Sequence, residues 1–259
     1  VAAGIKTVGY VLNHPAKELE QIRGFSEAKV QKVVEQAKKL LQAGFVTGNE
    51  CLRDREHILK ISSGSQQLNE MIGGGFQSKS ITELHGEFRT GKTQLCHTLC
   101  VTTQMPTDQG GAEGKVGYID TEGTFRPERV KEIAINFGFE PDMILDNVFF
   151  QRVNTSDEQI SCLNEIVALI TSGEPIKLVI VDSLMALFRT EYRGRGELSI
   201  RQQKIAGHLR DLQRISDEFN IPVIVTNQMS ADPGAMIAAC SQMPIGGNIV
   251  AHMCQTRLY

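Results

Sequence analysis

A short run of glycine, lysine and threonine has the composition and spacing of a phosphate-binding loop. Residues 86–93 read GEFRTGKT, which fits the pattern GxxxxGK(S/T). The run follows the apolar segment SITELH and opens the segment KTQLCHTL, so it joins an expected strand to an expected helix. Glycines let several backbone N–H groups point toward an anion, and the helix adds the positive end of its dipole. This context favours a triphosphate site over an ordinary glycine-rich turn.

Two side chains of this loop have expected roles in chemistry. Lys92 would reach the β- and γ-phosphates, and the Thr93 hydroxyl would bind Mg²⁺. The remaining nucleotide contacts would come from the rest of the loop and the first helical turn: Gly86, Glu87, Phe88, Arg89, Thr90, Gly91 and Gln94. ATP and Mg²⁺ are therefore the predicted cofactors.

Two further apolar runs end in carboxylates. KLVIVDS, residues 177–183, is typical of a strand buried on both faces, and it delivers Asp182 to its end. Beside a phosphate loop this Asp can orient Mg²⁺ through a water, although a turn or cap role is open. YIDTEGTFRPER, residues 118–129, places Asp120 and Glu122 after another strand. Glu122 is the candidate general base for the water that attacks the γ-phosphate, with a solvent-facing loop carboxylate as the alternative.

A fourth strand end carries amides. IPVIVTNQ, residues 221–228, ends with Asn227 and Gln228. The Gln228 amide can sense a γ-phosphate or orient water, and we include it with Lys92 and Glu122 among the catalytic candidates. Structural capping is an equally open interpretation for Asn227.

The segments that carry these residues alternate between strand and helix patterns. Such alternation predicts an α/β fold, a mostly parallel sheet with helices on both faces, in which ligands bind at the carboxyl ends of the strands. The expected strands cover residues 80–85, 115–119, 148–153, 177–182, 222–227 and 248–259. The expected helices cover residues 92–103, 127–137, 157–170 and 198–219.

The N-terminal part of the chain has a different pattern. Residues 1–44 predict a small all-helical domain with a glycine turn at Gly24 and Ser26 as the cap of the following helix. Periodicity fades over residues 45–60, which predicts a linker. Residues 61–259 would form the α/β core.

Composition limits the function classes. The chain has 259 residues, 41% of them hydrophobic, and a formal net charge of −3, so any contact with nucleic acid must be local. Residues 189–214 hold seven Lys and Arg against three Asp and Glu, 7 − 3 = +4. We expect no membrane segment or export signal, because no long apolar run or basic leader occurs. The six scattered cysteines predict reduced thiols that pack as small apolar groups.

Six motifs together resemble one family over essentially the whole chain: GEFRTGKTQL, IDTEGTFRPER, IVDSLMALFR, GRGELSIRQQK, TNQMSADPGA and PIGGNIVAH. They are similar to the eukaryotic RecA-type DNA strand-exchange recombinases, and MALFR, RQQK and the NQM run resemble the meiosis-specific branch. The resemblance implies a RecA-like P-loop core and a nuclear, DNA-dependent ATPase. It further implies a homo-oligomeric filament or ring on single-stranded DNA that exchanges strands with a duplex and works with mediator proteins.

The resemblance also assigns residues. Glu122 matches the family's water-activating glutamate, Arg129 the arginine that stacks on adenine, and Gln228 the link between the γ-phosphate and the DNA loops. The first DNA-binding loop would use these residues: Arg189, Tyr192, Arg195 and Arg201. The arginines neutralise phosphates without reading sequence, although a solvated helix face is an equally open interpretation. The second loop would run from Ser230 to Pro244, and it is short and lacks the family's lysines.

Phe45 resembles the family's aromatic anchor for the neighbouring protomer, with packing on its own domain as the alternative. The chain departs from the family at Gly48, where alanine is usual, and the missing methyl would weaken docking by about 0.8 kcal/mol. The IRGFSEAK turn resembles a helix-hairpin-helix, whose N–H groups can contact a DNA phosphate. Packing explains that turn equally well.

Two rival functions share these motifs. A RecA-like motor such as a hexameric helicase would use the same P-loop and strand-end carboxylates. A non-catalytic, ATP-binding recombinase-accessory paralogue would bind nucleotide to stabilise partners without exchanging strands.

Overall fold

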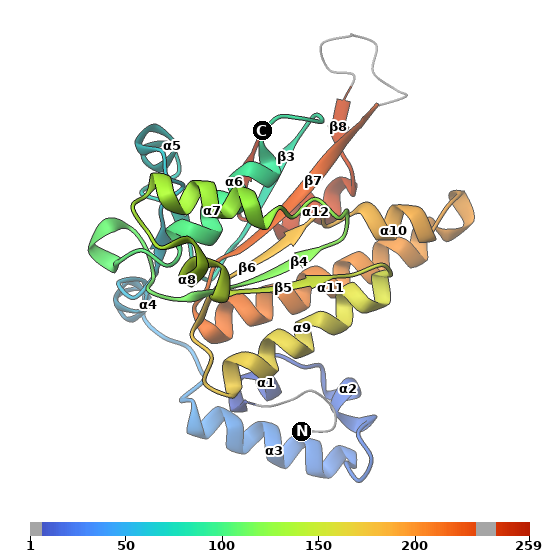
Figure 1. Cartoon of the computed structure of the whole chain (residues 1–259). Coiled ribbons are helices and arrows are strands. Elements are labelled where there is room, and N and C mark those ends of the chain that lie inside the picture. The colour runs from blue at the N-terminus through green and yellow to red at the C-terminus, as the bar shows by residue number, and fades with distance from the viewer. Residues whose placement is uncertain (1–6, 232–241) are drawn as a thin grey trace. The chain divides into compact units, whose positions relative to one another are not determined.

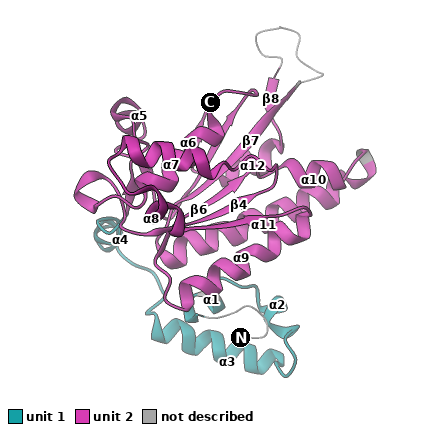
Figure 2. Cartoon of the chain, viewed as in Figure 1, with its two compact units in different colours: residues 1–58 teal, residues 59–259 magenta. Residues whose placement is uncertain are grey.

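The computed structural model describes residues 7–231 and 242–259, and the chain divides into two compact units, 1–58 and 59–259 (Figures 1 and 2). The predicted boundaries at residues 44 and 60 enclose this division. Whether residues 45–60 act as a linker stays a prediction.

The first unit is helical. It contains α1 (Val8–Leu12), α2 (Ala16–Glu20), α3 (Glu27–Leu40) and α4 (Gly48–Arg55). Gly24 makes the predicted turn with a φ of 92°, a value that favours glycine. Among the side chains of this unit that the structure describes, the buried ones are Leu19 of α2 and Val30 and Ala37 of α3. Ser26 is the residue before α3, but its side chain makes no capping hydrogen bond, so the predicted role of that hydroxyl is wrong.

Helix α4 lies within residues 45–60, where the sequence shows little hydrophobic periodicity. It is held by a capping box, in which Glu50 N donates to Thr47 Oγ1 at 3.2 Å and Thr47 N donates to Glu50 Oε2 at 2.7 Å. A Thr with Glu three residues later is a recognisable start signal, and such a cap stabilises a helix by about 1 kcal/mol. No residue of α4 is buried, which is why its hydrophobic pattern is weak.

The second unit is built on a sheet whose strand order is β5-β4-β6-β7-β3-β9, with all these neighbours parallel (Figure 1). The strands are β3 (Ile81–Gly86), β4 (Lys115–Asp120), β5 (Val148–Arg152), β6 (Ile176–Asp182), β7 (Val223–Ala231) and β9 (Thr256–Leu258). A short strand, β8 (Gln242–Pro244), pairs antiparallel with β7. A separate antiparallel pair joins β1 (Lys60–Ile61) to β2 (Phe76–Gln77).

Helices cover both faces of the sheet (Figure 1). One face carries α6 (Lys92–Thr102), α7 (Pro127–Asn136) and α8 (Pro141–Asp146), and the other carries α9 (Ser156–Thr171), α10 (Ala186–Glu191), α11 (Leu198–Phe219) and α12 (Gly247–Met253). The remaining helical segments are α5 (Gln66–Met71) and the 3-10 turns η1 (Thr107–Gln109) and η2 (Arg195–Glu197). None of the helices in the described ranges is long and apolar enough to cross a bilayer.

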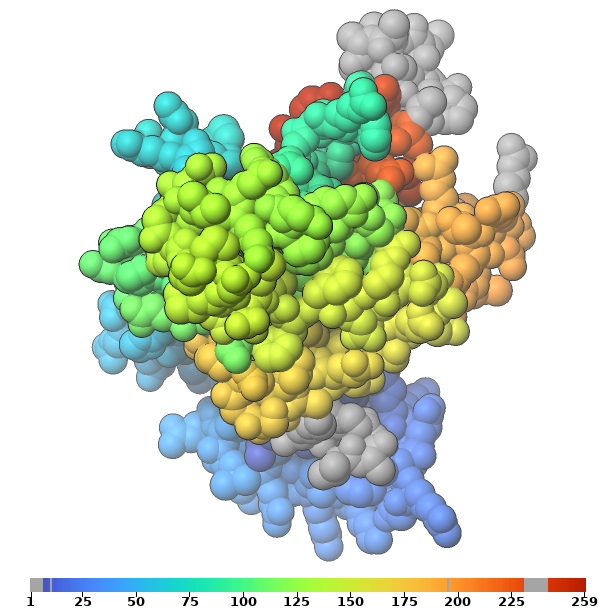
Figure 3. Space-filling view, viewed as in Figure 1, coloured from blue at the N-terminus to red at the C-terminus, as the bar shows by residue number. Residues whose placement is uncertain are grey.

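The central strands are buried on both sides, as their unbroken apolar runs predict. In β6, Leu178 and Ile180 pack with α6, α7 and α8, whereas Val179 and Val181 pack with the helices of the opposite face. In the space-filling view, the green-to-yellow part of the chain, which includes α7, α8 and α9, forms much of the visible surface of the second unit (Figure 3). Four of the cysteines belong to these cores: Cys96, Cys100, Cys162 and Cys254. Cys51 is exposed, and Cys240 lies outside the described residues.

One predicted strand is wrong. Residues 248–259 do not form a single strand, because α12 occupies residues 248–253 and only Thr256–Leu258 form a strand, β9. Ile249, Val250 and Met253 recur at helical spacing and pack against the core, and Gly246 and Gly247 precede them with φ values of 103° and 60°. The β-branched residues suggested a strand, but their period is that of a helix. The other predicted strands and helices are confirmed within two residues at each end, except that β7 continues four residues past the predicted end at Asn227, to Ala231.

A buried histidine in α11 should make stability depend on pH. His208 is buried, its Nε2 lies 3.2 Å from Gln159 Nε2, and burial lowers its pKa from 6.5 to about 4. The unfolded chain therefore takes up a proton near pH 6.5 and the folded chain only near pH 4, so stability is lost as the pH falls between these values. His208 alone should lower the free energy of unfolding by about 2 kcal/mol between about pH 7.5 and about pH 5.

Urea unfolding at both pH values measures this difference. His208→Leu should reduce it by that amount, whereas His252→Leu, at an exposed histidine, should leave it unchanged. An equal pH dependence in His208→Leu and the unaltered chain would contradict the assignment.

Candidate functional site

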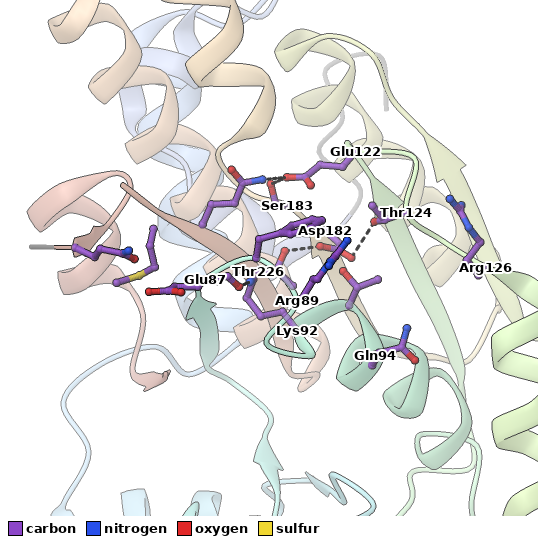
Figure 4. Close-up of a pocket in the computed structure, with 15 residues that line it drawn as sticks. Glu87, Arg89, Lys92, Gln94, Glu122, Thr124, Arg126, Asp182, Ser183 and Thr226 are labelled. Carbon is purple, nitrogen blue, oxygen red and sulfur yellow. Dashed lines mark hydrogen bonds between the residues drawn. The ribbon is translucent and has the colours of Figure 1, made fainter. Parts of the chain in front are cut away.

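The register of the parallel strands brings the predicted residues to one edge of the sheet. Gly86 of β3 lies beside Gln228 of β7, and Asp120 of β4 lies beside Asp182 of β6. A cavity of about 580 Å³ opens at this edge (Figure 4). Its lining residues are Glu87, Phe88, Arg89, Lys92, Thr93, Gln94, Glu122, Thr124, Arg126, Asp182, Ser183, Thr226, Gln228, Met229 and Gln242.

The glycine-rich loop between β3 and α6 has the curled backbone that its composition predicts. Arg89 and Gly91 have φ values of 67° and 96°. The Lys92 ammonium donates to the carbonyl oxygens of Gly86 at 2.9 Å and Glu87 at 2.7 Å, so it lies over the loop. Burial lowers the pKa of Lys92, and the charges of Asp182 and Glu122 oppose that shift. A positive charge is thus held where the pattern expects phosphate.

Other residues of the loop are divided between two cavities. Gly86, Thr90 and Gly91 line a neighbouring cavity of about 730 Å³ instead of the first one, whereas Glu87 and Lys92 line both. A Cβ at Gly86 would lie 2.8 Å from Thr90 Oγ1, so the tight turn leaves no room for a side chain there.

Asp182 is buried and held by three hydroxyls. Thr226 Oγ1 donates to its Oδ1 at 2.5 Å, and Thr124 Oγ1 lies 3.4 Å from Oδ2 (Figure 4). Tyr118 OH also donates to Oδ2, at 2.9 Å. Burial raises the pKa of Tyr118, which keeps this phenol protonated as a donor. Tyr118 and Thr226 were missed in the sequence analysis. Their signal was a hydroxyl on each of the two strands, β4 and β7, that flank the strand of Asp182.

The residues present fit a magnesium ion that is shared with phosphate. Thr93 and Asp182 line the same cavity and supply hard oxygen donors, which Mg²⁺ prefers. No cluster of three or more His, Cys, Asp or Glu residues that could bind a metal occurs in residues 7–231 and 242–259. The protein would therefore supply few ligands, which is usual where phosphates and waters complete the shell.

Glu122 connects three strand ends. Its Oε1 accepts hydrogen bonds from Ser183 Oγ at 2.6 Å and from Gln228 Nε2 at 2.7 Å (Figure 4). Glu122 and Ser183 follow β4 and β6, and Gln228 lies within β7. The candidate base and the candidate amide sensor are therefore in direct contact. Ser183 was missed in the sequence because a serine after an aspartate carries no separate signal.

Asp120 shapes the loop that carries Glu122. Its Oδ1 accepts from the backbone N–H groups of Glu122 at 2.9 Å, Gly123 at 2.7 Å and Thr124 at 3.3 Å. Arg152 Nη1 donates to the same oxygen at 3.2 Å. Asp120 is buried, so its carboxylate holds the loop rather than facing the cavity.

His97 joins the same loop to helix α6. Its buried Nε2 accepts from Arg126 N at 3.2 Å, and burial lowers its pKa, so the neutral imidazole is the acceptor. The ring packs on Phe125 with centroids 5.4 Å apart. The Arg126 guanidinium donates to the carbonyls of Gly123 and Phe125 at the rim of the cavity.

Arg129, the predicted adenine contact, does not line the cavity but lies beside a residue that does. Its Nε donates to Gln94 Oε1 at 2.9 Å, and its Nη1 contacts Glu132 at 2.7 Å. Its role toward adenine stays a prediction.

The predicted DNA-binding residues lie apart from the cavity lining. Arg189 is exposed at the end of α10. Lys204 Nζ lies 5.1 Å from the Tyr192 ring centroid and also contacts Asp157 at 2.7 Å. Arg201 is half-buried in α11, and within the described part of the chain its Nε has no hydrogen-bond partner.

Parts of the predicted DNA loops lie outside the described structure. The Arg195 side chain and residues 232–241, most of the second loop, are among them. In the first unit, Phe45 is fully exposed. The cavity geometry tests none of these three predictions.

Comparison with known proteins gives a matching family and several similar proteins. The family described as Rad51 matches residues 54–259. An Arabidopsis thaliana protein named Meiotic recombination protein DMC1 homolog is 48% identical over 257 residues, which cover 99% of this chain and 74% of that protein. Meiotic recombination protein DMC1 of Saccharomyces cerevisiae is 48% identical over 260 residues, 99% of this chain and 78% of its own. DNA repair protein RAD51 homolog B of Zea mays is 48% identical over 259 residues, 99% of this chain and 76% of its own.

Removing the lysine that lies over the loop should weaken nucleotide binding. Lys92→Ala deletes the ammonium but leaves the backbone N–H groups, so we expect the affinity for a fluorescent ATP analogue to fall by at least about tenfold. Titration by fluorescence anisotropy measures the change. Lys131→Ala, at a lysine of α7 that does not line the cavity, is the matched control. Equal affinity in Lys92→Ala and Lys131→Ala would place the triphosphate elsewhere.

Proposed function

The chain belongs to the Rad51 family, and from that premise we propose that it is an ATP-dependent recombinase. It assembles on single-stranded DNA, searches a duplex for homology and exchanges strands in meiotic recombination and double-strand break repair. The names of its relatives support this reading, since the compared proteins are called meiotic recombination or DNA repair proteins. Its place of action is then the nucleus.

One contact carries the proposal. Gln228 Nε2 donates to Glu122 Oε1 at 2.7 Å inside the P-loop cavity, and Gln228 belongs to β7, which runs on toward the predicted second DNA loop. A change at the phosphate site can therefore move a strand that leads to DNA. A nucleotide site without such a link would have no means to make the DNA contact depend on ATP.

The cavity supports hydrolysis of ATP. Glu122 Oε1 is occupied by two donors, so the carboxylate is held in place at the cavity and can take a proton from a water molecule. That water attacks the γ-phosphorus, the bond to the bridging oxygen breaks, and ADP leaves with the electron pair. Lys92 stabilises the negative charge that spreads over the phosphate oxygens. When bound to Thr93 and Asp182, Mg²⁺ neutralises phosphate charge.

DNA contact is assigned to the arginine-rich segment around α10. Arg189, Tyr192, Arg195 and Arg201 belong to the stretch whose charge excess is +4, within a chain whose net charge is −3. Gly194 has a φ of 89°, which lets the backbone turn between two of these arginines. Arginines that bind phosphates without reading bases suit an enzyme whose specificity comes from base pairing.

DNA should stimulate ATP turnover. We expect single-stranded DNA to raise the turnover number of the whole chain severalfold, because Gln228 links the two sites. Arg189→Ala should reduce this stimulation and lower the slope of log affinity against log salt by about 1, whereas Arg210→Ala, at an exposed arginine of α11, should do neither.

Turnover by phosphate release, with and without DNA, separates the rivals. An accessory ATP-binding paralogue would show no turnover in either condition, and a motor would also unwind a tailed duplex processively. Equal ATP turnover with and without single-stranded DNA would contradict the proposed coupling between the two sites.

Self-association is assigned to Phe45. Its side chain is fully exposed and Val46 beside it is 59% exposed, a small apolar patch on the first unit that suits a second copy of the chain. Helical filaments arise when one surface of a protomer binds a different surface of the next. Mediator proteins that load the recombinase on DNA are further proposed partners.

A charge at this patch should prevent assembly. Phe45→Glu is expected to shift the particle mass with ATP and DNA from polymer to monomer, because a carboxylate would be buried in the contact. Mass photometry measures the distribution, and Leu40→Glu, at another exposed apolar residue of the first unit, is the control. Polymers of normal length in Phe45→Glu would remove Phe45 from the interface.

A further inference from the structure

A carboxylate with no exposed surface lies in the strand that leads to the P-loop. Glu83 of β3 accepts from Arg257 Nε of β9 at 2.5 Å through Oε2, and from Asn227 Nδ2 of β7 at 2.6 Å through Oε1. β9 and β7 are the two strands that flank β3. A buried charge is tolerated when it is paired and hydrogen-bonded. Glu83 therefore ties three strands together three residues before Gly86.

Asn227 extends this tie to the segment that follows β8. Its Nδ2 also donates to Ile245 O at 2.6 Å, and Ile245 N donates to Gln228 O at 3.0 Å. Both backbone polar groups of Ile245 are thus bonded to the Asn227-Gln228 pair. The orientation of the Asn227 amide follows from its partners, because the opposite orientation would turn its oxygen toward two acceptors.

These contacts hold the part of β7 that β6 does not reach. The β6–β7 pairing ends at Val181 and Val225, and Leu184 N then donates to Thr226 O at 2.9 Å. In the described part of the chain, residues 227 and 228 pair in the sheet with β3 alone. Besides its pairing with β3, the backbone of Gln228 is therefore held by the contacts of Asn227 and Ile245, and its side-chain amide reaches Glu122.

We propose that Asn227 is a positioning residue for Gln228, and that Glu83 orients the Asn227 amide for this task. The inference rests on the proposed ATPase and adds residues that do not line the cavity themselves. Its consequence is that the P-loop strand and the amide sensor move as one body. A displacement of β3 is then passed to Gln228 through a buried carboxylate.

The first variant replaces the amide donor of Asn227 with an acceptor of the same size. Asn227→Asp places an oxygen against Glu83 and against Ile245 O, which displaces Gln228. We expect single-turnover ATP hydrolysis in the presence of single-stranded DNA to slow by at least about tenfold, since misplacement of about 1 Å can cost that much. The affinity for the ATP analogue should stay within about twofold, because Asn227 does not line the cavity.

A double-mutant cycle tests whether Asn227 acts through Gln228. If it does, Asn227→Asp should add nothing to Gln228→Ala, and the double variant should hydrolyse ATP at the rate of Gln228→Ala alone. A residue with a merely structural role would multiply the two losses. Multiplied losses, or normal hydrolysis in Asn227→Asp, would overturn the inference.

A second variant covers the case in which Asn227→Asp does not fold. In Glu83→Gln/Asn227→Asp the new amide can donate to the new carboxylate and the total charge is unchanged, so folding should be restored while the contact with Ile245 O stays broken. Hydrolysis should remain slow in this pair, and wild-type hydrolysis in it would also overturn the inference.

The matched control is Ser216→Ala, which removes a buried hydrogen bond of 2.7 Å to Ile221 O in the same unit. It should lower the melting temperature without changing hydrolysis, and slowing equal to that of Asn227→Asp would make the effect a general loss of stability and overturn the inference. An unaltered chain that never hydrolyses ATP contradicts the proposed function, and the inference with it.

Discussion

The site depends on the register of the parallel sheet. Gly86 is paired with Gln228 and Asp120 with Asp182, so the ends of β3, β7, β4 and β6 meet along one edge. Parallel strands put all their carboxyl ends on the same side, and loops that leave this side can meet over a ligand. A shift of one residue in a single strand would turn its polar end residue to the other face. The buried apolar faces of β6 resist such a shift, because both are packed against helices.

The three acidic side chains at this edge have different surroundings and therefore different roles. Asp120 is buried and occupied by backbone N–H groups, so it shapes a loop. Asp182 is held by hydroxyls and lines the cavity with Thr93, where it can share a metal ion with phosphate. Glu122 lines the cavity and is fixed by Ser183 and Gln228, and it is the proposed general base. The differences arise from the donors around each carboxylate, which decide whether its oxygens are left to bind a metal ion or a water molecule.

A second feature is that the nucleotide site is linked to distant segments through buried polar contacts rather than through apolar packing alone. Gln228 lies between Glu122 on one side and the Asn227-Ile245 contact on the other. Hydrogen bonds have strict geometry, so they transmit a small displacement that a hydrophobic contact would absorb. Under the proposed function, these contacts are the route by which ATP would control DNA binding, and the residues that matter most for it are in β7 and β3.

The sequence by itself determined the local chemistry: the GxxxxGKT loop, the carboxylate after KLVIVDS and the strand and helix periods followed from residue types at short spacing. It did not determine contacts between residues far apart in the chain. Asn227 could have been a cap or a sensor, and only the sheet showed it bonded to Glu83 and Ile245. Likewise α12 was mistaken for a strand, because β-branched residues favour strands locally and packing on the core overrode that preference. Hydrogen bonds between strands depend on register, which propensity and periodicity do not encode, so the tertiary structure alone decided which polar side chains meet.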